Sequence, residues 1–315
     1  MRLCLLILIG LLNLNILLSQ QDLQISQYMY SHLLTNPGSA GSNDMICVNS
    51  IVRQQWLNFP GAPQNLIFNF DLPFKLLGAN HGAGVSMVQD KFGNYTDIDL
   101  KLSYAYRANV SDGKLGIGIY GGFINRKLEA KWQVPAGENI NTDPQIPQEN
   151  QNEMTFDLGL GLFYRTEDLY MGVSATHLIL PSFDYQSSTG FSSKDELNIH
   201  YYLTAGYNLQ MANPSYELKP SVFIKTDTKI TSYDFNVLLA YNKKIWGGVS
   251  YRLLSSIIGM IGIDVFNGLK IGYAYDFATN SINKYSAGTH EFTVNYCFKI
   301  GVEKGVQKYK SIRFL

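Results

Sequence analysis

Residues 290–301 read HEFTVNYCFKIG and decide the fold, because apolar and polar side chains alternate along the whole stretch. The apolar set is Phe292, Val294, Tyr296, Phe298 and Ile300, and the polar set is Thr293, Asn295, Cys297 and Lys299. Strict alternation places the two sets on opposite faces of a β-strand. A run of about ten residues with one aromatic-rich apolar face fits a strand that crosses a bilayer between lipid and a lumen. A strand of a soluble sandwich alternates in the same way, so the choice between a membrane barrel and a soluble sandwich depends on the rest of the chain.

The same alternation recurs along most of the chain, without the helix-period segments that a mixed fold needs. We count about fourteen strand candidates, each close to the roughly ten residues that a tilted barrel strand requires. They begin near Ile46, Asn65, Gly82, Thr96, Gly113, Met154, Asp168, Asn198, Tyr216, Tyr233, Lys244, Ile257, Gly268 and Thr289. The sequence therefore predicts an all-β protein, a single antiparallel outer-membrane β-barrel of about 14 strands.

The lengths of the connections support a barrel with both ends of the chain in the periplasm, because long connections should then follow odd-numbered strands. The long connections after odd strands are 127–152, 179–197 and 278–288. The tight connections after even strands are 110–112, 166–167, 242–243 and 267–268. Two connections break the rule: 73–81 is long for a periplasmic turn, and 254–256 is short for an outer loop.

Composition agrees with an outer-membrane barrel. Charged residues make up 16% of the chain, below the roughly 25% of soluble domains, whereas Tyr (21), Phe (17) and Gly (28) are plentiful. Lys plus Arg equals Asp plus Glu, at 25 each, so the net charge gives no sign of a nucleic-acid partner. Charges of both signs fall on the expected lumen face, which favours paired, space-filling side chains over an ion-selective pore.

The first twenty residues are read as a Sec signal peptide, with Arg2 before an apolar run and small or polar residues after it. A short membrane anchor is the alternative, disfavoured by the shortness of the run and its two Asn residues. We expect residues 1–20 to be removed, 21–45 to form an irregular periplasmic segment, 46–301 to form the transmembrane barrel and 302–315 to form a periplasmic tail.

No constellation in the sequence indicates catalysis. Gly-Val-Ser triplets end at Ser86, Ser174 and Ser250, but each lacks the second Gly of a nucleophile elbow. The five His residues show no metal-ligand spacing. We therefore expect no catalytic residues, no cofactor, no metal and no enzymatic activity, and keep a barrel-embedded lipid hydrolase as the weakest alternative.

Cys47 and Cys297 are the cysteines that remain after signal cleavage, and an even pair in an exported protein raises the question of a disulfide. In a closed barrel the first and last strands are antiparallel neighbours, and both cysteines fall on the inward parity toward the periplasmic end. A bridge requires directly opposed positions, a register that the sequence does not define. We favour two small buried thiols and keep the disulfide as the alternative.

Several stretches resemble one known family. QDLQISQYM at 21–29, LTNPGSAGS at 34–42, RQQW at 53–56, FPGAP at 59–63, HE at 290–291 and the terminal YKSIRFL at 309–315 are similar to motifs of the PorP/SprF family of type IX secretion system membrane proteins from Bacteroidetes. The resemblance covers essentially the whole mature chain, and the opening stretch and the RQQW motif are its specific part.

The resemblance implies an outer-membrane barrel that works beside the type IX translocon and receives or anchors secreted proteins, such as adhesins used in gliding. Its partners would be outer-membrane lipid, the C-terminal region of a secreted protein and other type IX secretion components. The candidate partner-binding residues are Arg53, Gln54, Gln55, Trp56, Phe59, Pro60, Gly61, Ala62 and Pro63. Their alternative role is structural, as an inward Arg, a girdle Trp and a rigid outer turn.

The sequence also nominates the long connections 127–152 and 179–197 as partner-binding loops, since they are rich in Asn, Gln, Ser and Tyr. A secreted chain could bind there by adding a strand. A passive diffusion porin remains the alternative function, because a barrel of this size could conduct. The charges of both signs in the lumen and the N-terminal segment, which could fold into the periplasmic mouth of the barrel, argue against an open channel.

Overall fold

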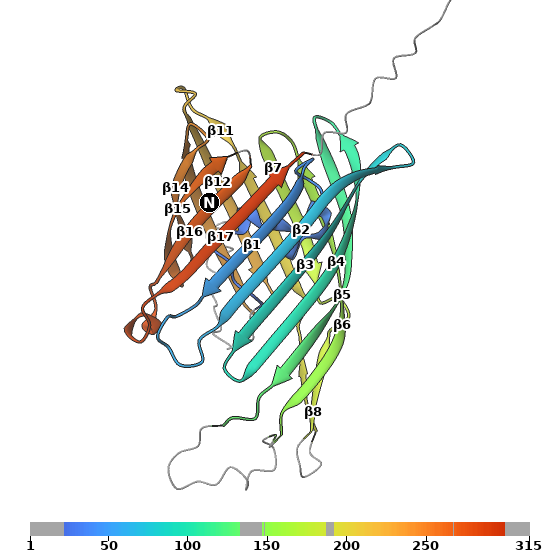
Figure 1. Ribbon diagram of the computed structural model, residues 1–315, viewed down its shortest axis with the longest axis vertical. Coiled ribbons are helices and arrows are strands. Elements are labelled where there is room, and N and C mark those ends of the chain that lie inside the picture. Colours follow the sequence, from blue (N-terminus) through green and yellow to red (C-terminus); the bar gives the residue numbers. More distant parts are fainter. Residues whose placement is uncertain (1–21, 133–146, 148, 187–191, 267, 300–315) are drawn as a thin grey trace, which may run out of the picture.

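A computed structural model of the chain describes residues 22–132, 147, 149–186, 192–266 and 268–299, and shows a closed antiparallel barrel (Figure 1). The strands of the wall are β1 (Ile46–Gln54), β2 (Gln64–Leu76), β3 (Ala79–Phe92), β4 (Tyr95–Val110), β5 (Gly113–Leu128), β6 (Gln151–Arg165), β7 (Leu169–Thr176), β10 (His200–Tyr207), β12 (Tyr216–Thr226), β13 (Thr231–Tyr241), β14 (Ile245–Arg252), β15 (Ser256–Phe266), β16 (Leu269–Ala278) and β17 (Thr289–Phe298). The expected signal peptide and the expected tail at 302–315 lie outside the described residues.

Each wall strand pairs with its two neighbours in the chain, and β1 pairs with β17 to close the barrel. The short β11 (Leu209–Gln210) extends the sheet beside β12. All fourteen predicted strands are present and begin within three residues of the predicted positions, so the predicted fold class is confirmed. No helix among the described residues is both long and apolar enough to span a membrane.

The two faces of the wall separate as the alternation predicts. On β4, Leu102, Tyr104 and Tyr106 are exposed, while Lys101 and Arg107 on the other parity are buried toward the lumen. Exposed tyrosines lie near both ends of the wall strands: Tyr207, Tyr241 and Tyr296 away from the long connections, and Tyr201 and Tyr251 toward them. These are the positions of interfacial aromatic belts.

The connection after β2, which looked too long in the sequence, is a two-residue hairpin turn. β2 continues through Pro73 to Leu76, and only Leu77 and Gly78, both with positive φ, separate it from β3. Positive φ at both central residues suits the right-handed twist of the flanking strands. Pro73 pairs with Gly82 of β3 but lies past the end of the β1–β2 ladder, so its missing N–H removes no hydrogen bond there.

We call the end of the barrel that carries the long β5–β6 and β7–β10 connections the outer end; it is the lower end in Figure 1. The β7–β10 connection contains a hairpin, β8 (Ser182–Gln186) paired with β9 (Ser192–Glu196). The β16–β17 connection, also at the outer end, contains the short 3-10 helix η4 (Ser281–Lys284).

Candidate functional site in the lumen and at the outer end

Residues 22–45, here called the lumen segment, run inside the barrel (Figure 1). At the outer end, the backbone N–H of Asp22 donates to Nε2 of His200, 3.3 Å away. At the opposite end, Asp44 forms ion pairs of 2.8 Å with Arg107 and Lys114, close to the β4–β5 turn. The sequence predicted a periplasmic segment that could fold into the mouth of the barrel; in the structure residues 22–45 run through the lumen from one end to the other, where their apolar and polar side chains both find partners.

Apolar side chains of the lumen segment contact both sides of the barrel. The segment forms η1 (Tyr28–Tyr30), the one-turn helix α2 (His32–Thr35) and η2 (Pro37–Ser39). The rings of Tyr28 and Phe223 stack at 4.9 Å between centroids. The buried cluster joins Ile25, Tyr28 and Leu34 of the segment to Ile51, Ile67 and Val88 on β1–β3 and to Tyr202 and Phe223 on β10 and β12. The segment therefore crosses the lumen from one side of the wall to the other, and a cavity of about 630 Å³ remains beside it.

Glycines on the lumen face of β5 and β6 let the segment lie directly against the wall backbone. A Cβ on Gly116 would overlap the carbonyl oxygen of Gly38, and one on Gly118 would overlap the Gly38 nitrogen. A Cβ on Gly161 would overlap the side chain of Asn36. That side chain accepts a hydrogen bond from the Gly38 N–H and donates one to the Leu162 carbonyl, both 2.9 Å long. The missing side chains thus form a seat for residues 36–38.

Arg53 is the centre of a buried charged cluster that holds the start of the segment. Its guanidinium lies 2.9 Å from Glu291 and 2.8 Å from Asp276, and donates to the Ser26 hydroxyl at 2.8 Å. The backbone N–H groups of Ser26 and Gln27 both donate to the Glu291 carboxylate at 2.7 Å. Only 2% of Arg53 is exposed, so its charge is stabilised by the neighbouring carboxylates rather than by water.

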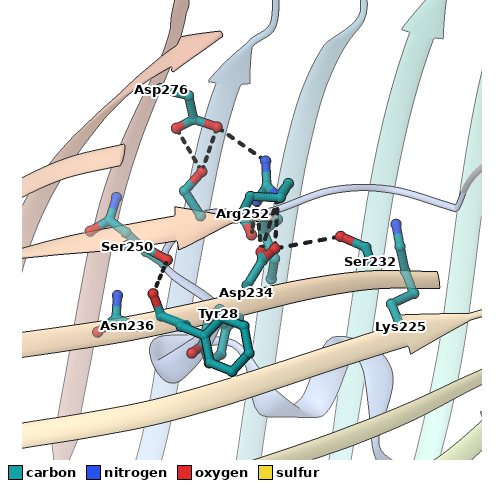
Figure 2. Close-up of polar contacts among 12 residues, drawn as sticks. Tyr28, Lys225, Ser232, Asp234, Asn236, Ser250, Arg252 and Asp276 are labelled. Carbon is teal, nitrogen blue, oxygen red and sulfur yellow. Dashed lines mark hydrogen bonds and ion pairs between the residues drawn. The ribbon is translucent and has the colours of Figure 1, made fainter. Parts of the chain in front are cut away.

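Arg252 extends this cluster along the wall. Figure 2 shows it between Asp234, 2.9 Å away, and Asp276, 3.3 Å away. Its guanidinium also donates to the backbone carbonyl of Ile25 at 3.4 Å. Mixed-sign charges in the lumen are thus paired and space-filling, as the sequence suggested, and they bind the segment through its backbone as well as its side chains.

A second polar cluster surrounds Asp22 at the outer end. Its carboxylate accepts from the Tyr202 hydroxyl and lies 3.8 Å from Nε2 of His177, whose Nδ1 lies 3.1 Å from Asp157. Burial disfavours charge on both members of the Asp22–His177 pair. Their hydrogen bonds outweigh it: His177 holds the pKa of Asp22 well below its usual value, and Asp157 and Asp22 raise the pKa of His177 to about 9.

The proposed partner-binding stretch divides between lumen and surface. Arg53 lies in the lumen, Gln54 is exposed on the wall, and Gln55 and Trp56 are half-buried where β1 ends. Phe59, Pro60 and Gly61 are exposed at the tip of the β1–β2 connection, followed by the half-buried Ala62 and Pro63. Only the part after Arg53 is thus in a position to meet an external partner.

Backbone hydrogen bonds fasten that connection to its neighbours. Leu57 donates to Gly288 and accepts from Ala287, both at 2.8 Å, in the β16–β17 connection. Gly61 accepts from Gly93 of the β3–β4 turn at 2.9 Å. Three adjacent outer connections therefore form one continuous surface.

The β8–β9 hairpin is also fastened to the outer end. Phe183 and Tyr185 are buried against Ile124 and Leu128 of β5. Arg126 lies over the Phe183 ring at 4.2 Å, and forms ion pairs of 2.6 Å with Asp97 of the wall and Asp195 of the hairpin. The described part of the second nominated loop is thus a packed element.

Cys47 and Cys297 are directly opposed in the β1–β17 ladder, and the structure joins them by a disulfide with Cα atoms 4.1 Å apart. The sequence analysis favoured free thiols, because backbone hydrogen bonds are enough to close a barrel and free cysteine packs as a small apolar side chain; the structure has the disulfide instead. With the register given, the inward parity of both cysteines brings them together.

The three serines of the Gly-Val-Ser triplets lie buried on the lumen face. Ser174 donates to the Thr35 carbonyl at 2.7 Å, and Ser250 donates to the Phe235 carbonyl at 3.1 Å. Two of the three hydroxyls therefore take part in structural hydrogen bonds.

Comparison with known proteins assigns the family. The sequence model described as "Type IX secretion system membrane protein PorP/SprF" matches residues 17–296. The chain belongs to the PorP/SprF family. No curated protein sequence matches it. Among solved structures, the CymD monoaromatic hydrocarbon channel is similar at 12% identity and a TM-score of 0.51, over 86% of this chain and 93% of that one.

Two further solved structures are similar to this chain. The Ralstonia pickettii toluene transporter TbuX has 12% identity and a TM-score of 0.46, over 86% of this chain and 94% of its own. The Acinetobacter baumannii protein Omp33 has 9% identity and a TM-score of 0.45, over 82% and 100%. The PorP/SprF match and the barrel architecture place the protein in the outer membrane.

Three stretches on which the resemblance to the PorP/SprF family was based meet at one point of the structure. The opening stretch contributes Ser26, the RQQW stretch contributes Arg53, and the HE pair contributes Glu291. The sequence analysis listed Arg53 as a partner-binding residue. It did not identify Glu291 or His177 as functional residues, nor the contacts between the lumen segment and the wall. The inward parity of Arg53 and Glu291 was the available signal, since both lie on the lumen face of adjacent strands.

Proposed function

We propose that this PorP/SprF family protein is a non-enzymatic outer-membrane component of type IX secretion, which receives or anchors a secreted surface protein at its outer end. The observation that carries the proposal is the buried bonding of the lumen segment to Arg53, Asp276 and Glu291. A barrel whose lumen is crossed in this way is suited to hold a partner on its surface rather than to let solutes through.

The outer end offers two features that fit this role. The β1–β2 connection presents exposed Phe59 and Pro60 on a backbone held by its neighbours, and a preorganised surface loses little entropy on binding. In the described residues, β8 and β9 pair only with each other, so the hairpin keeps unpaired edges. Such an edge can accept an additional strand from the C-terminal region of a secreted chain.

The test replaces these features in the native host. One variant exchanges residues 182–196 for a short Gly-Ser linker, and a second carries Phe59→Ser with Pro60→Ser. A control carries Asn242→Gly with Lys243→Gly, in a turn at the opposite end whose positive φ values suit glycine. Antibody labelling of intact cells measures how much secreted protein is retained on the surface, and mass spectrometry identifies what copurifies with the barrel.

We expect each outer variant to lower surface retention roughly tenfold, as for loss of a binding hot spot, and to lose the secreted chain from the purified complex. The control should retain both. Equal retention in all strains, with the variants correctly assembled, would remove the basis of the proposal.

A passive diffusion porin is the competing function, and the similarity to a hydrocarbon channel concerns the fold alone. The packing of Ile25, Tyr28 and Leu34 against opposite sides of the wall favours the secretion role over an open pore. An enzymatic function is not favoured by the serines considered above, because the lumen hydroxyls of Ser174 and Ser250 donate to backbone carbonyls.

A further inference from the structure

Asp22, His177 and His200 bring one carboxylate and two imidazoles to a common point at the outer end of the lumen. One potential ligand atom from each residue lies within 4.8 Å of the other two. In a tetrahedral zinc site with bonds of about 2.0–2.1 Å, ligand atoms lie about 3.3 Å apart. The ligand atoms would therefore have to approach one another by up to about 1.5 Å on binding the metal.

Both imidazoles are oriented as metal ligands usually are. Nδ1 of His177 lies 3.1 Å from the Asp157 carboxylate, and Nδ1 of His200 lies 3.1 Å from the Asn198 carbonyl. A histidine whose Nδ1–H is held by an acceptor has its Nε2 lone pair free, and this pairing is the common second contact of metal-bound histidines. Nε2 of His177 lies 3.8 Å from the Asp22 carboxylate, and Nε2 of His200 accepts from the Asp22 backbone N–H at 3.3 Å. A metal ion would replace that hydrogen bond of His200 and the proton that His177 shares with Asp22.

The carboxylate of Asp22 is also held in place. It accepts hydrogen bonds from the Tyr202 hydroxyl and from the Leu23 N–H, the latter at 2.7 Å. Lys225 donates to the backbone carbonyls of Asp22 and Leu23 rather than to the carboxylate. The carboxylate therefore stays available to a metal ion.

The surrounding charge favours a cation. Asp22, Asp157 and Asp99 supply three carboxylates, against the two ammonium groups of Lys101 and Lys225, and Lys101 is paired with Asp99 at 2.8 Å. A cavity of about 110 Å³ adjoins the three residues. That volume exceeds the roughly 10–15 Å³ that a water molecule needs, so water could complete the coordination.

We propose that Asp22, His177 and His200 form a binding site for a divalent transition-metal ion; two imidazoles and one carboxylate are a ligand set that Zn²⁺ accepts, and Zn²⁺ is the probe used below. The metal would tie the outer part of the lumen segment to the ends of β7 and β10. Because these three residues lie far apart in the sequence, the site could not be predicted from the spacing of a motif. This proposal is independent of the secretion role.

The experiment uses the purified full-length mature protein in detergent, stripped with a chelator and then titrated with ZnCl₂. We expect one Zn²⁺ per chain by calorimetry and by metal analysis after gel filtration. Asp22→Asn, His177→Gln and His200→Gln should each weaken binding at least roughly tenfold. His290→Gln is the matched control, because His290 lies at the outer end but bonds to Tyr273 instead.

A measurement on the unmodified protein keeps the proposal testable if a variant fails to assemble. Diethylpyrocarbonate modification, followed by mass spectrometry, should slow roughly tenfold at His177 and His200 in the presence of Zn²⁺ and stay unchanged at His290. The proposal is overturned by the absence of stoichiometric Zn²⁺ binding, by equal affinity in the three ligand variants, or by equal modification rates with and without the metal.

Discussion

Arg53 bonds to residues near both ends of the chain, and its replacement tests the charged cluster most directly. Arg53→Met leaves Glu291 and Asp276 buried with fewer compensating charges. Removing one partner of a buried ion pair costs about 3–5 kcal/mol. We expect a loss of that order in the free energy of unfolding, measured by urea titration in detergent. Lys131→Met is the control, since Lys131 is 79% exposed beside Glu129, where a pair contributes at most about 1 kcal/mol. Equal midpoints for the two variants would contradict the assignment.

His32 should make the docking of the lumen segment sensitive to acid. Its ring packs 5.2 Å from Phe163 and 4.7 Å from Tyr170, and burial, helped by the charge of Arg165, lowers its pKa to about 3. Since this lies below the ordinary value of 6.5, protonation favours the undocked state; His32 opposes docking progressively as pH falls from 6.5 toward 3. Between pH 7.5 and 5 we expect the wild type to lose about 1–2 kcal/mol more stability than His32→Phe. Parallel pH profiles would exclude this role.

At the scale of elements, β5 offers a matched pair of glycines on opposite faces. Gly118→Ala places a methyl group into the backbone of residues 37–38, whereas Gly121→Ala meets nothing within 4 Å. We expect Gly118→Ala to displace the segment and to destabilise the protein by about 1–3 kcal/mol, as overpacking does. Gly121→Ala should be neutral or slightly stabilising. Thermal denaturation followed by gel mobility distinguishes them, and equal effects would show that residues 36–38 do not depend on the glycine seat.

The seam between β1 and β17 carries the Cys47–Cys297 bridge, which closes a loop of 250 residues. Thiol counting on the monomeric mature protein, denatured without reduction, should detect no free thiols. Replacing both cysteines by serine should lower the free energy of unfolding by about 2–5 kcal/mol. Two free thiols in the wild type would exclude the bridge.

The wall strands could be predicted from the sequence because the signals for each strand are local: alternating apolar and polar residues, and turn residues at its ends. The end of β2 was predicted too early because Pro73 was taken to end the strand. Proline is tolerated there because β1 no longer pairs with β2 beyond Asp71, a fact that the sequence alone does not reveal. The path of residues 22–45 was beyond prediction because its information is long-range: Ser26 bonds to Glu291 across 265 positions. The same holds for His177 and His200, whose proximity to Asp22 follows from barrel closure rather than from any motif.

For the whole molecule, we expect the lumen segment to decide whether the barrel conducts. In planar bilayers we expect the full mature chain to be nearly silent. A variant that lacks residues 22–43 should show large, steady conductance, because the contacts of Ile25, Tyr28 and Leu34 across the lumen are then gone. A synthetic peptide of residues 22–43 should restore the block. Steady conductance of the full chain would favour the porin, and silence of a folded deletion variant would show that something else closes the lumen.

The position of the lumen segment also constrains how the protein is assembled. Ser26 bonds to Arg53 on the first strand, to Asp276 on β16 and, through its N–H, to Glu291 on the last strand, so it bridges the seam from inside. A closed wall cannot admit this segment sideways. Either β1 and β17 pair after the lumen segment is already in place, or the lumen segment enters the barrel through one open end after the wall has closed. In the first case the earliest part of the chain is the template on which the latest part is aligned.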